Sequence, residues 1–187
     1  HTDSPFLAQP PSITILFGRD IPTFGGDTMW ANSALAYAFL SDTMKETLAK
    51  LRVHMSARTV LAEVRKGAEK YGEKSLGGTP LKFDADTLIA GAVHPLVRTH
   101  PVTGEKALYV DDSYAVSIDG MTEPEAAAML GFLRHHVTQP AFTCRLRWAP
   151  NTLTVWDNRL CIHHAFNDHD GQRREMFRTT VLGEVPA

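Results

Sequence analysis

The residues best suited to chemistry lie at the two ends of the chain. His1 and Asp3 place an imidazole and a carboxylate two positions apart, so both side chains project from the same face of an extended segment. Far downstream, residues 156–164 (WDNRLCIHH) supply a third possible ligand, His163 or His164. Two histidines and one carboxylate on one face of an octahedral metal leave coordination positions open, as in non-haem Fe(II) sites. These residue types therefore predict a metal site with room for further ligands.

Two arginines that follow His163 and His164 in the sequence could bind anions. Arg174 and Arg178 are four residues apart, so on a regular strand both side chains face the same way. A planar guanidinium binds a carboxylate through two parallel hydrogen bonds, which a lysine matches only as a point charge. The alternative is a pair of exposed strand residues whose aliphatic stems lie along the surface. A pair of anion sites near the metal would account for both arginines.

The composition is that of an ordinary globular domain. The chain has 187 residues, 43% of them hydrophobic and 21% charged, which fits one domain. A net charge of -2 with no long block of like charge argues against nucleic acid as a partner, and no apolar run is long enough to indicate a membrane span. Two cysteines, Cys144 and Cys161, do not make a disulfide framework and favour a reducing, cytoplasmic compartment.

The elements that must position these residues are mostly short strands. Flanking turns and β-branched residues predict strands at residues 12–17, 93–100, 107–110, 142–148, 152–156 and 176–182. Two short helices are predicted between Ser33 and Leu51, and a longer one after the capping-box spacing of residues 122–125. Many short strands with a few inserted helices favour a β-sandwich or barrel over a doubly wound sheet.

Two stretches need a separate interpretation. Residues 58–92 are charged and interrupted by glycines without a clear period, which predicts a mobile surface excursion and a candidate lid. The chain also begins at His1 without a methionine or a leader-like segment. We therefore expect residues 1–187 to form a single domain that lacks its N-terminal segment.

Five segments in this order resemble the taurine dioxygenase (TauD/TfdA) family of Fe(II)/2-oxoglutarate-dependent dioxygenases. They are residues 1–3 (HTD), 25–30 (GGDTMW), 94–101 (HPLVRTHP), 156–164 (WDNRLCIHH) and 172–178 (QRREMFR). The similarity extends through nearly all of the chain. It implies a mainly β fold with inserted helices, the double-stranded β-helix or jelly roll of cupin type. It also implies one catalytic domain and a homo-oligomer, a dimer or a tetramer.

The resemblance assigns the metal ligands to individual residues. His1 and Asp3 would be the near ligands, and His163 the distal ligand, since the family's distal histidine follows the Trp-Asp-Asn-Arg motif after three residues. His164 is the competing candidate, but its side chain would point to the opposite face of an extended segment. The metal implied by the family is Fe(II).

Other residues match the family's cosubstrate and substrate positions. Thr28 and Arg174 would bind the far carboxylate of 2-oxoglutarate, and Arg178 would hold the anionic group of the substrate. Ser4 and Phe6 follow the metal carboxylate closely enough to line the same space. No residue beyond the metal ligands is expected to act as a catalytic group, because the bound cofactors carry out the oxidation.

The implied activity is hydroxylation of a small anionic substrate, with 2-oxoglutarate and O2 consumed and succinate and CO2 released. Sulfonates, sulfate esters and aryloxyalkanoates are the substrate classes that the family suggests. Two departures weaken a specific expectation of taurine. Asp111 and Asp112 stand where many relatives have Asn after the return strand, and Ser4 directly follows the metal carboxylate.

Two alternatives belong to other classes of protein. The first is a non-catalytic metal-binding jelly roll, against which the retention of Thr28 and Arg174 argues. The second takes His1 as a mature N-terminus whose amine and imidazole chelate copper. Such a copper site would require a second histidine but neither Asp3 nor the two arginines.

Overall fold

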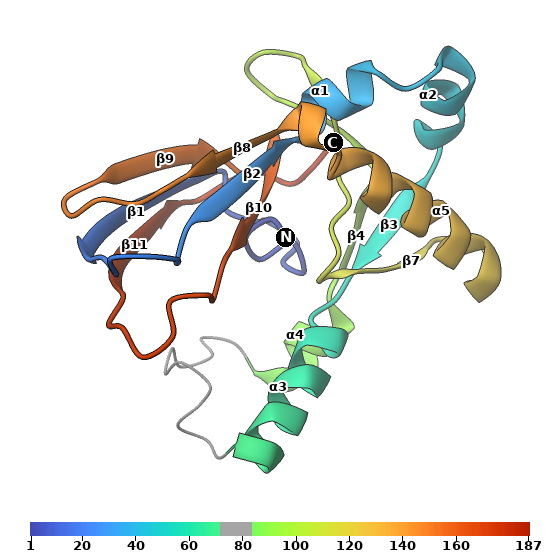
Figure 1. Ribbon diagram of the computed structural model, residues 1–187. Coiled ribbons are helices and arrows are strands. Elements are labelled where there is room, and N and C mark those ends of the chain that lie inside the picture. Colours follow the sequence, from blue (N-terminus) through green and yellow to red (C-terminus); the bar gives the residue numbers. More distant parts are fainter. Residues whose placement is uncertain (72–83) are drawn as a thin grey trace.

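In the computed structural model, which describes residues 1–71 and 84–187, two three-stranded antiparallel sheets form the strand-rich half of the molecule (Figure 1). The first sheet has the order β11 (Glu175–Val181), β1 (Ile13–Asp20), β9 (Leu153–Asp157). The second has the order β10 (Cys161–Ala165), β2 (Thr28–Asn32), β8 (Thr143–Leu146). Trp30 of β2 and Trp156 of β9 meet edge to face, with ring centroids 5.5 Å apart, so the sheets pack against each other.

Strand register decides which side chains of the first sheet face the interior. Thr14 of β1 is opposite Trp156 of β9 and is completely buried, whereas Phe17 stacks on Phe177 of β11 on the other face. Leu16 is opposite Arg178 of β11. Because side chains alternate between the two faces of a strand, Thr14, Trp156 and Arg178 share the inner face.

The other half of the molecule combines a third sheet with helices. Its strands are β4 (Ala92–Pro95), β3 (Arg52–Met55) and β7 (Ala115–Ile118), and a hairpin of β5 (Val97–Thr99) and β6 (Lys106–Leu108) follows β4. The helical elements are α1 (Ser33–Ala38), α2 (Asp42–Leu48), α3 (Arg58–Tyr71), α4 (Ala85–Ala90), α5 (Glu123–Val137) and the 3-10 turn Pro140–Phe142. The main hydrophobic core lies in this half, around Leu48, Val53 and Leu133.

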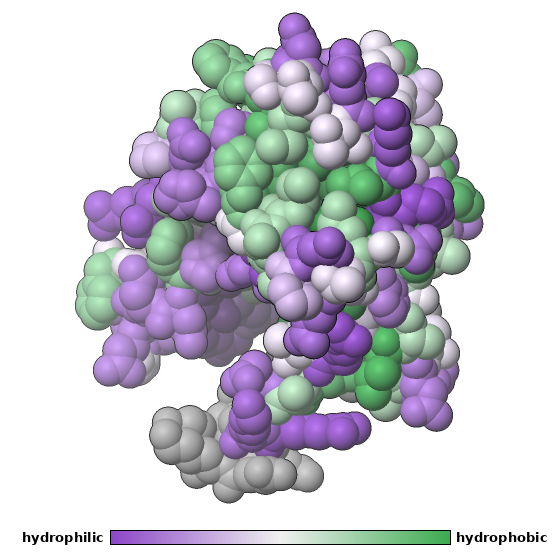
Figure 2. Space-filling model, turned by 90° about the vertical axis from the view of Figure 1, so that its right-hand side faces the viewer, coloured by the Kyte–Doolittle hydropathy of each residue, from purple (hydrophilic) through white to green (hydrophobic). Residues whose placement is uncertain are grey.

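Helix α5 forms where its sequence signals predicted. Thr122 and Glu125 make a capping box, and Ala126, Leu130 and Leu133 lie buried on one helical face. Apolar residues also gather on the outer face that carries α5 and α2 (Figure 2). Among the described residues, no helix is both long enough and apolar enough to cross a membrane.

Most of the predicted elements are present, but two interpretations were wrong. The two helices before residue 51, the hairpin and the strands predicted at 12–17, 142–148, 152–156 and 176–182 are confirmed. The predicted strand 93–100 is split at Leu96, where the chain changes partners: the Leu96 amide donates to the carbonyl oxygen of Leu51 beside β3, and the Leu96 carbonyl oxygen accepts from the Tyr109 amide beside β6. Residues 58–92 are not devoid of regular structure, because α3 and α4 lie there, with Leu61 and Leu88 buried together. Residues 72–83 of that predicted excursion lie outside the described residues.

Three strands that bear on the site were not predicted. They are β2, β3 and β7, which are only four or five residues long. β2 carries Thr28 and runs between β10 and β8, so its short apolar run is stabilised by pairing on both sides. Such a short strand is stabilised by the strands that pair with it in space, and the local sequence gives no information about those partners.

Candidate functional site

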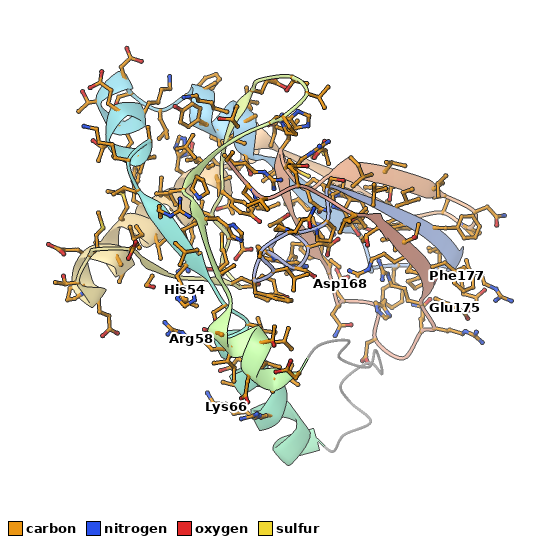
Figure 3. All side chains as sticks on the ribbon, turned by 180° about the vertical axis from the view of Figure 1, so that it is seen from behind. His54, Arg58, Lys66, Asp168, Glu175 and Phe177 are labelled. Atoms are coloured by element: carbon orange, nitrogen blue, oxygen red, sulfur yellow. The ribbon has the colours of Figure 1, made fainter. Side chains whose placement is uncertain are left out.

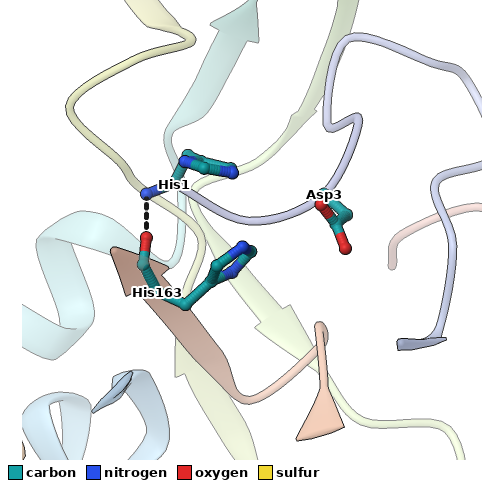
Figure 4. Close-up of side chains that lie close together, drawn as sticks. All are labelled: His1, Asp3 and His163. Carbon is teal, nitrogen blue, oxygen red and sulfur yellow. Dashed lines mark hydrogen bonds between the residues drawn. The ribbon is translucent and has the colours of Figure 1, made fainter. Parts of the chain in front are cut away.

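Three potential metal ligands meet between the two halves of the molecule (Figure 4). One ligand atom from each of His1, Asp3 and His163 can be chosen so that all three atoms lie within 4.8 Å of one another. The backbone nitrogen of His1 donates to the carbonyl oxygen of His163 over 2.9 Å, and the His163 amide donates back to the His1 carbonyl over 2.7 Å. This reciprocal pair fixes the first residues against β10 and brings ligands from both ends of the chain together.

The chemical state of these groups suits a divalent metal. Burial lowers the pKa of His163 to about 4, so its ring is neutral at physiological pH and can offer a lone pair. Its buried Nδ1 atom has no hydrogen-bond partner among the described residues. Asp3 is only 5% exposed. Neutral imidazoles with a carboxylate are a donor set for Fe(II) and similar ions, and the inclusion of Asp3 favours it over the copper alternative.

The structure distinguishes the two neighbouring histidines. His163 belongs to the cluster, while His164 is exposed and its ring meets Phe166 edge to face at 4.8 Å. His164 lines a pocket of about 380 Å³ that also reaches His1 and His163. Asp3, Thr28 and both arginines do not line this pocket. The cluster of potential ligands therefore includes His163 and not His164.

Both carboxylate oxygens of Asp3 have partners. Oδ2 accepts a hydrogen bond from the Thr14 hydroxyl at 2.5 Å, and Oδ1 accepts one from Nη1 of Arg178 at 3.1 Å. Ser4, the next residue, has a φ of 48°, which turns the chain sharply after Asp3. The carboxylate is therefore held from the strands β1 and β11 on the inner face of the first sheet.

Asp111 fixes the backbone between the two ligands of the first segment. Its Oδ2 accepts from the Thr2 amide at 3.3 Å, and its Oδ1 accepts from the amides of Ser113, Tyr114 and Ala115. The side chain is 1% exposed, so these backbone groups take the place of water around it. Sequence reasoning noted Asp111 only as a departure from the family, and no local signal pointed to this contact across 109 residues.

Thr28 and Arg174 form a second polar site. The completely buried Thr28 hydroxyl accepts a hydrogen bond from Nε1 of Trp148 at 2.9 Å, and because an indole only donates, the hydroxyl hydrogen remains free to donate elsewhere. Arg174 has a buried Nη2 without a partner among the described residues, and burial lowers its pKa. A carboxylate placed between these donors would satisfy both.

A glycine allows the backbone to approach Arg174 closely. Nε of Arg174 donates to the carbonyl oxygen of Gly26 at 3.2 Å, two residues before Thr28. Gly26 has a φ of 70°, and a Cβ at this position would lie 3.0 Å from Cδ of Arg174. The Gly26 amide donates to Oδ1 of Asp168 at 2.7 Å, which pins the turn. This tight turn thus brings the Arg174 side chain against the backbone two residues before Thr28.

Two aromatic side chains, Phe6 and Tyr114, pack beside the ligand segment, and we call them the aromatic wall. The ring of Tyr114 meets His1 edge to face at 5.9 Å and Phe6 at 5.2 Å. Burial raises the pKa of Tyr114 to about 12, so its hydroxyl stays protonated. Phe6 and Tyr114 also contact the small cluster that includes Leu61 of α3. Phe6 was a predicted site residue, whereas Tyr114 was not.

His54 lies apart from the cluster of candidate metal ligands. His54 is at the end of β3 close to α4 and Arg58, and its Nε2 lies 2.7 Å from the carbonyl oxygen of Ala90 (Figure 3). Glu175 and Phe177 mark β11 on the opposite side of that view. Glu175 pairs with Arg19 at 3.2 Å on the surface. These exposed contacts take no part in the cluster.

The geometry combines a three-donor centre with two cationic groups of different burial. Three protein ligands leave further positions on a six-coordinate metal. Arg174 offers a buried nitrogen that has no partner within the described part of the chain, whereas the Arg178 side chain is 54% exposed and touches the cluster itself. The first suits a deeply bound carboxylate, and the second suits an anion that enters from solvent.

Comparisons with known proteins agree with this arrangement. The chain spans about half the length of the curated relatives it matches. One of these, the alpha-ketoglutarate-dependent sulfate ester dioxygenase of Pseudomonas putida, is 32% identical over 191 residues, which cover 100% of this chain and 60% of the relative.

Solved structures extend the likeness to three dimensions. A taurine dioxygenase from Burkholderia xenovorans matches with a TM-score of 0.80 and 37% identity, over 100% of this chain and 57% of that one. AAD-2 in complex with Mn(II) and N-oxalylglycine matches with a TM-score of 0.81 and 33% identity, over 100% and 69%. The jelly-roll fold is confirmed by these matches. The model of the "Taurine catabolism dioxygenase TauD, TfdA family" matches residues 1–180, and the chain therefore belongs to this family.

Proposed function

We propose that the protein is an Fe(II)- and 2-oxoglutarate-dependent dioxygenase; 2-oxoglutarate is the alpha-ketoglutarate in the names of its relatives. Its substrate is a small organic anion of the sulfonate, sulfate ester or aryloxyalkanoate class. The observation that carries the proposal is the cluster of His1, Asp3 and His163, together with the buried nitrogen of Arg174 for which residues 1–71 and 84–187 supply no partner. The first binds the metal, and the second binds the cosubstrate's far carboxylate.

The residues of the chain bind and orient, and the cofactors carry the oxidation. Bound Fe(II) would supply the activation of O2. Thr28 donates its free hydroxyl hydrogen to the far carboxylate of 2-oxoglutarate, and Arg174 adds a charge-assisted hydrogen bond. The four electrons that O2 accepts come in two pairs, one from decarboxylation of 2-oxoglutarate and one from a substrate C–H bond. One oxygen atom enters succinate and the other becomes the new hydroxyl group.

Arg178 is the proposed anchor for the substrate anion. It lies on the inner face of β11, with its guanidinium beside Asp3, so an anion bound there would hold the rest of the substrate close to the metal. Such positioning can lower a barrier by several kcal/mol, on the order of 7–11 in well-oriented intramolecular reactions. Ser4, Phe6 and Tyr114 would line the same space. The named activities of the relatives, on a sulfate ester and on taurine, support an anionic substrate.

Further proposals concern the whole protein. We propose that residues 1–187 act as one catalytic domain and that the segment 58–92 includes a lid, because α3 and α4 contact the aromatic wall at Phe6 and Tyr114. Both cysteines, Cys144 and Cys161, are free, which supports a cytoplasmic location. The family resemblance supports a homo-oligomer, a dimer or a tetramer, without nucleic acid or membrane as a partner.

An anaerobic titration tests the proposed function. Fe(II) and 2-oxoglutarate are added to the protein, and the weak visible charge-transfer band of the chelate is recorded for the unmodified protein, His163→Ala and His164→Ala. The proposal expects a band that His163→Ala abolishes and His164→Ala retains. Absence of the band and of 2-oxoglutarate binding in the metal-loaded, unmodified protein would contradict it and favour a non-catalytic metal-binding jelly roll.

A further inference from the structure

A line of buried hydrogen bonds runs from β9 to the candidate metal carboxylate. Nε1 of Trp156 donates to Oδ1 of Asn158 at 2.9 Å, and Nδ2 of Asn158 donates to the Thr14 hydroxyl at 2.8 Å. The Thr14 hydroxyl donates in turn to Oδ2 of Asp3 at 2.5 Å. All four side chains are at least nine-tenths buried, so no solvent molecule substitutes for these contacts. We call this line the Asp3 relay.

The direction of every bond in the Asp3 relay follows from the donor chemistry. An indole nitrogen can only donate, so the Asn158 atom facing Trp156 is its oxygen and the amide nitrogen faces Thr14. Because the Thr14 oxygen receives that hydrogen, its own hydrogen points to Asp3. The carboxylate oxygen Oδ2 is therefore held by a donor that has no other orientation available.

The two oxygens of Asp3 differ in how readily they can change partners. Oδ2 is bound to Thr14, which is completely buried on β1. Oδ1 is bound to Arg178, whose side chain is 54% exposed and can move into solvent. We propose, on the basis of the function proposed above, that Thr14 and Asn158 are positioning residues that make Asp3 bind the metal through Oδ1 alone.

Binding through one oxygen matters for the number of open positions. Three ligands with one donor atom each leave about three positions on a six-coordinate metal, and a carboxylate that bound through both oxygens would leave about two. A chelating 2-oxoglutarate needs two positions, so only the first arrangement keeps a place for O2. The Asp3 relay thus determines whether the centre can hold both cosubstrates at once.

The backbone of Asn158 supports the same segment. Its carbonyl oxygen accepts from the Thr2 hydroxyl at 3.0 Å, and its amide donates to the carbonyl oxygen of Ser12 at 2.8 Å. Asn158 therefore contacts the residue between the two near ligands with its main chain and orients Asp3 with its side chain. An isolated packing role would not require this combination of contacts.

Mn(II) is the probe for the test, because its binding and its bound water can both be measured without turnover. Free Mn(II) is counted by electron paramagnetic resonance to obtain a dissociation constant, and water-proton relaxation reports how many waters exchange on the bound ion. The variants are Thr14→Val, which removes the donor to Asp3, and Thr14→Ser, which keeps it. Thr154→Val is the matched control, since the Thr154 hydroxyl contacts the carbonyl oxygen of Leu16 and not the Asp3 relay.

A second variant changes the direction of the relay without removing volume. Asn158→Asp still accepts from Trp156 but cannot donate to Thr14, so the hydrogen that fixed the Thr14 orientation is lost and the Thr14 hydroxyl is shared between the new carboxylate and Asp3. It remains informative if Thr14→Val does not fold. Circular dichroism and thermal melting establish the fold of each variant before the titration.

The expected result is a loss of about one third of the relaxation per bound Mn(II) in Thr14→Val and Asn158→Asp, since three open positions become two. Mn(II) affinity in Thr14→Val should change by about 10- to 100-fold. Thr14→Ser and Thr154→Val should match the unmodified protein. Folded Thr14→Val or Asn158→Asp protein with unchanged relaxation would overturn the relay proposal alone. Failure of the unmodified protein to bind Mn(II) would overturn the metal site and the relay with it.

Discussion

The guanidinium of Arg178 lies 3.1 Å from Oδ1 of Asp3, so the candidate metal carboxylate has a cation directly beside it. Two elements make this contact, the segment after His1 and the strand β11. A metal at Oδ1 would compete with Arg178, and an anion at Arg178 would draw it away from Asp3. Binding of metal and of substrate anion should therefore be coupled through this ion pair.

We expect Arg178→Gln to bind Mn(II) about 1.4- to fivefold more tightly than the unmodified protein, because a partly exposed ion pair of about 0.2–1 kcal/mol no longer has to be broken. By reciprocity, a small sulfonate should tighten Mn(II) binding in the unmodified protein and not in the variant. Mn(II) titrations with and without the sulfonate measure both effects. Weaker Mn(II) binding by the variant would show that Arg178 supports the bound state instead.

Arg174 should determine the affinity for 2-oxoglutarate. Arg174→Lys replaces a planar fork by a point charge, and we expect 2-oxoglutarate to bind about 10- to 100-fold more weakly, with Mn(II) affinity unchanged. Arg173→Lys is the matched control, because Arg173 pairs with Asp20 and Glu175 on the surface. Equilibrium dialysis of 2-oxoglutarate against Mn(II)-loaded protein gives the dissociation constants. Equal losses in both variants would argue against a specific role for Arg174.

Asp111 should stabilise the ligand segment through its charge and its two acceptor oxygens. Asp111→Asn turns an acceptor into an NH2 group facing the Thr2 amide, so we expect unfolding free energy to fall by about 1–3 kcal/mol and Mn(II) binding to weaken. Asp112→Asn changes a side chain that is 87% exposed and should leave both unchanged. Urea unfolding and Mn(II) titration provide the comparison. The role is wrong if the two variants behave alike.

The positive φ of Ser4 predicts opposite effects of two substitutions. Ser4→Gly should raise the free energy of unfolding by up to about 1 kcal/mol, because glycine adopts this backbone conformation without steric cost. Ser4→Val, with a branched Cβ, should lower it by about 1–2 kcal/mol. Urea denaturation of the metal-free protein measures both. A stabilised Val variant would mean that the turn after Asp3 relaxes easily.

Acid should destabilise the metal-free protein through its buried histidines. Burial lowers the pKa of His163 to about 4, so between about pH 6.5 and pH 4 the unfolded chain binds a proton that the folded chain does not. The free energy of unfolding should therefore fall as pH falls through this window, by at most about 3 kcal/mol from this residue. Above about pH 6.5 the histidine is neutral in both the folded and the unfolded chain, so no stability is lost there. Burial also lowers the pKa of His94, which acts in the same direction.

Urea unfolding at pH values from about 7.5 to about 5 tests the sign. His163→Gln should flatten the pH dependence, and His164→Gln, at an exposed position on the opposite side of β10, should not. Identical pH profiles for all three proteins would assign the acid sensitivity to other groups.

The ligands and anion-binding residues could be proposed from the sequence because their chemistry is unusual and their order matches a family. Alternation along one strand was enough to separate His163 from His164. The contacts that hold them could not be foreseen. Asn158 and Asp111 reach Thr2 of the ligand segment across 156 and 109 residues, through pairings that only the folded chain creates. Short strands such as β2 were missed for the same reason, since their stability comes from neighbours on both sides.

The reciprocal hydrogen bonds between His1 and His163 also have a kinetic consequence. They join residues 162 positions apart, so the candidate centre closes one of the longest loops in the chain. Contacts of such high sequence separation carry a large closure entropy and form slowly. A metal that binds only when His1 and His163 are in contact would stabilise the native structure, and it would lower the unfolding rate more than it raises the folding rate. Resistance to proteolysis should then report occupancy of the site.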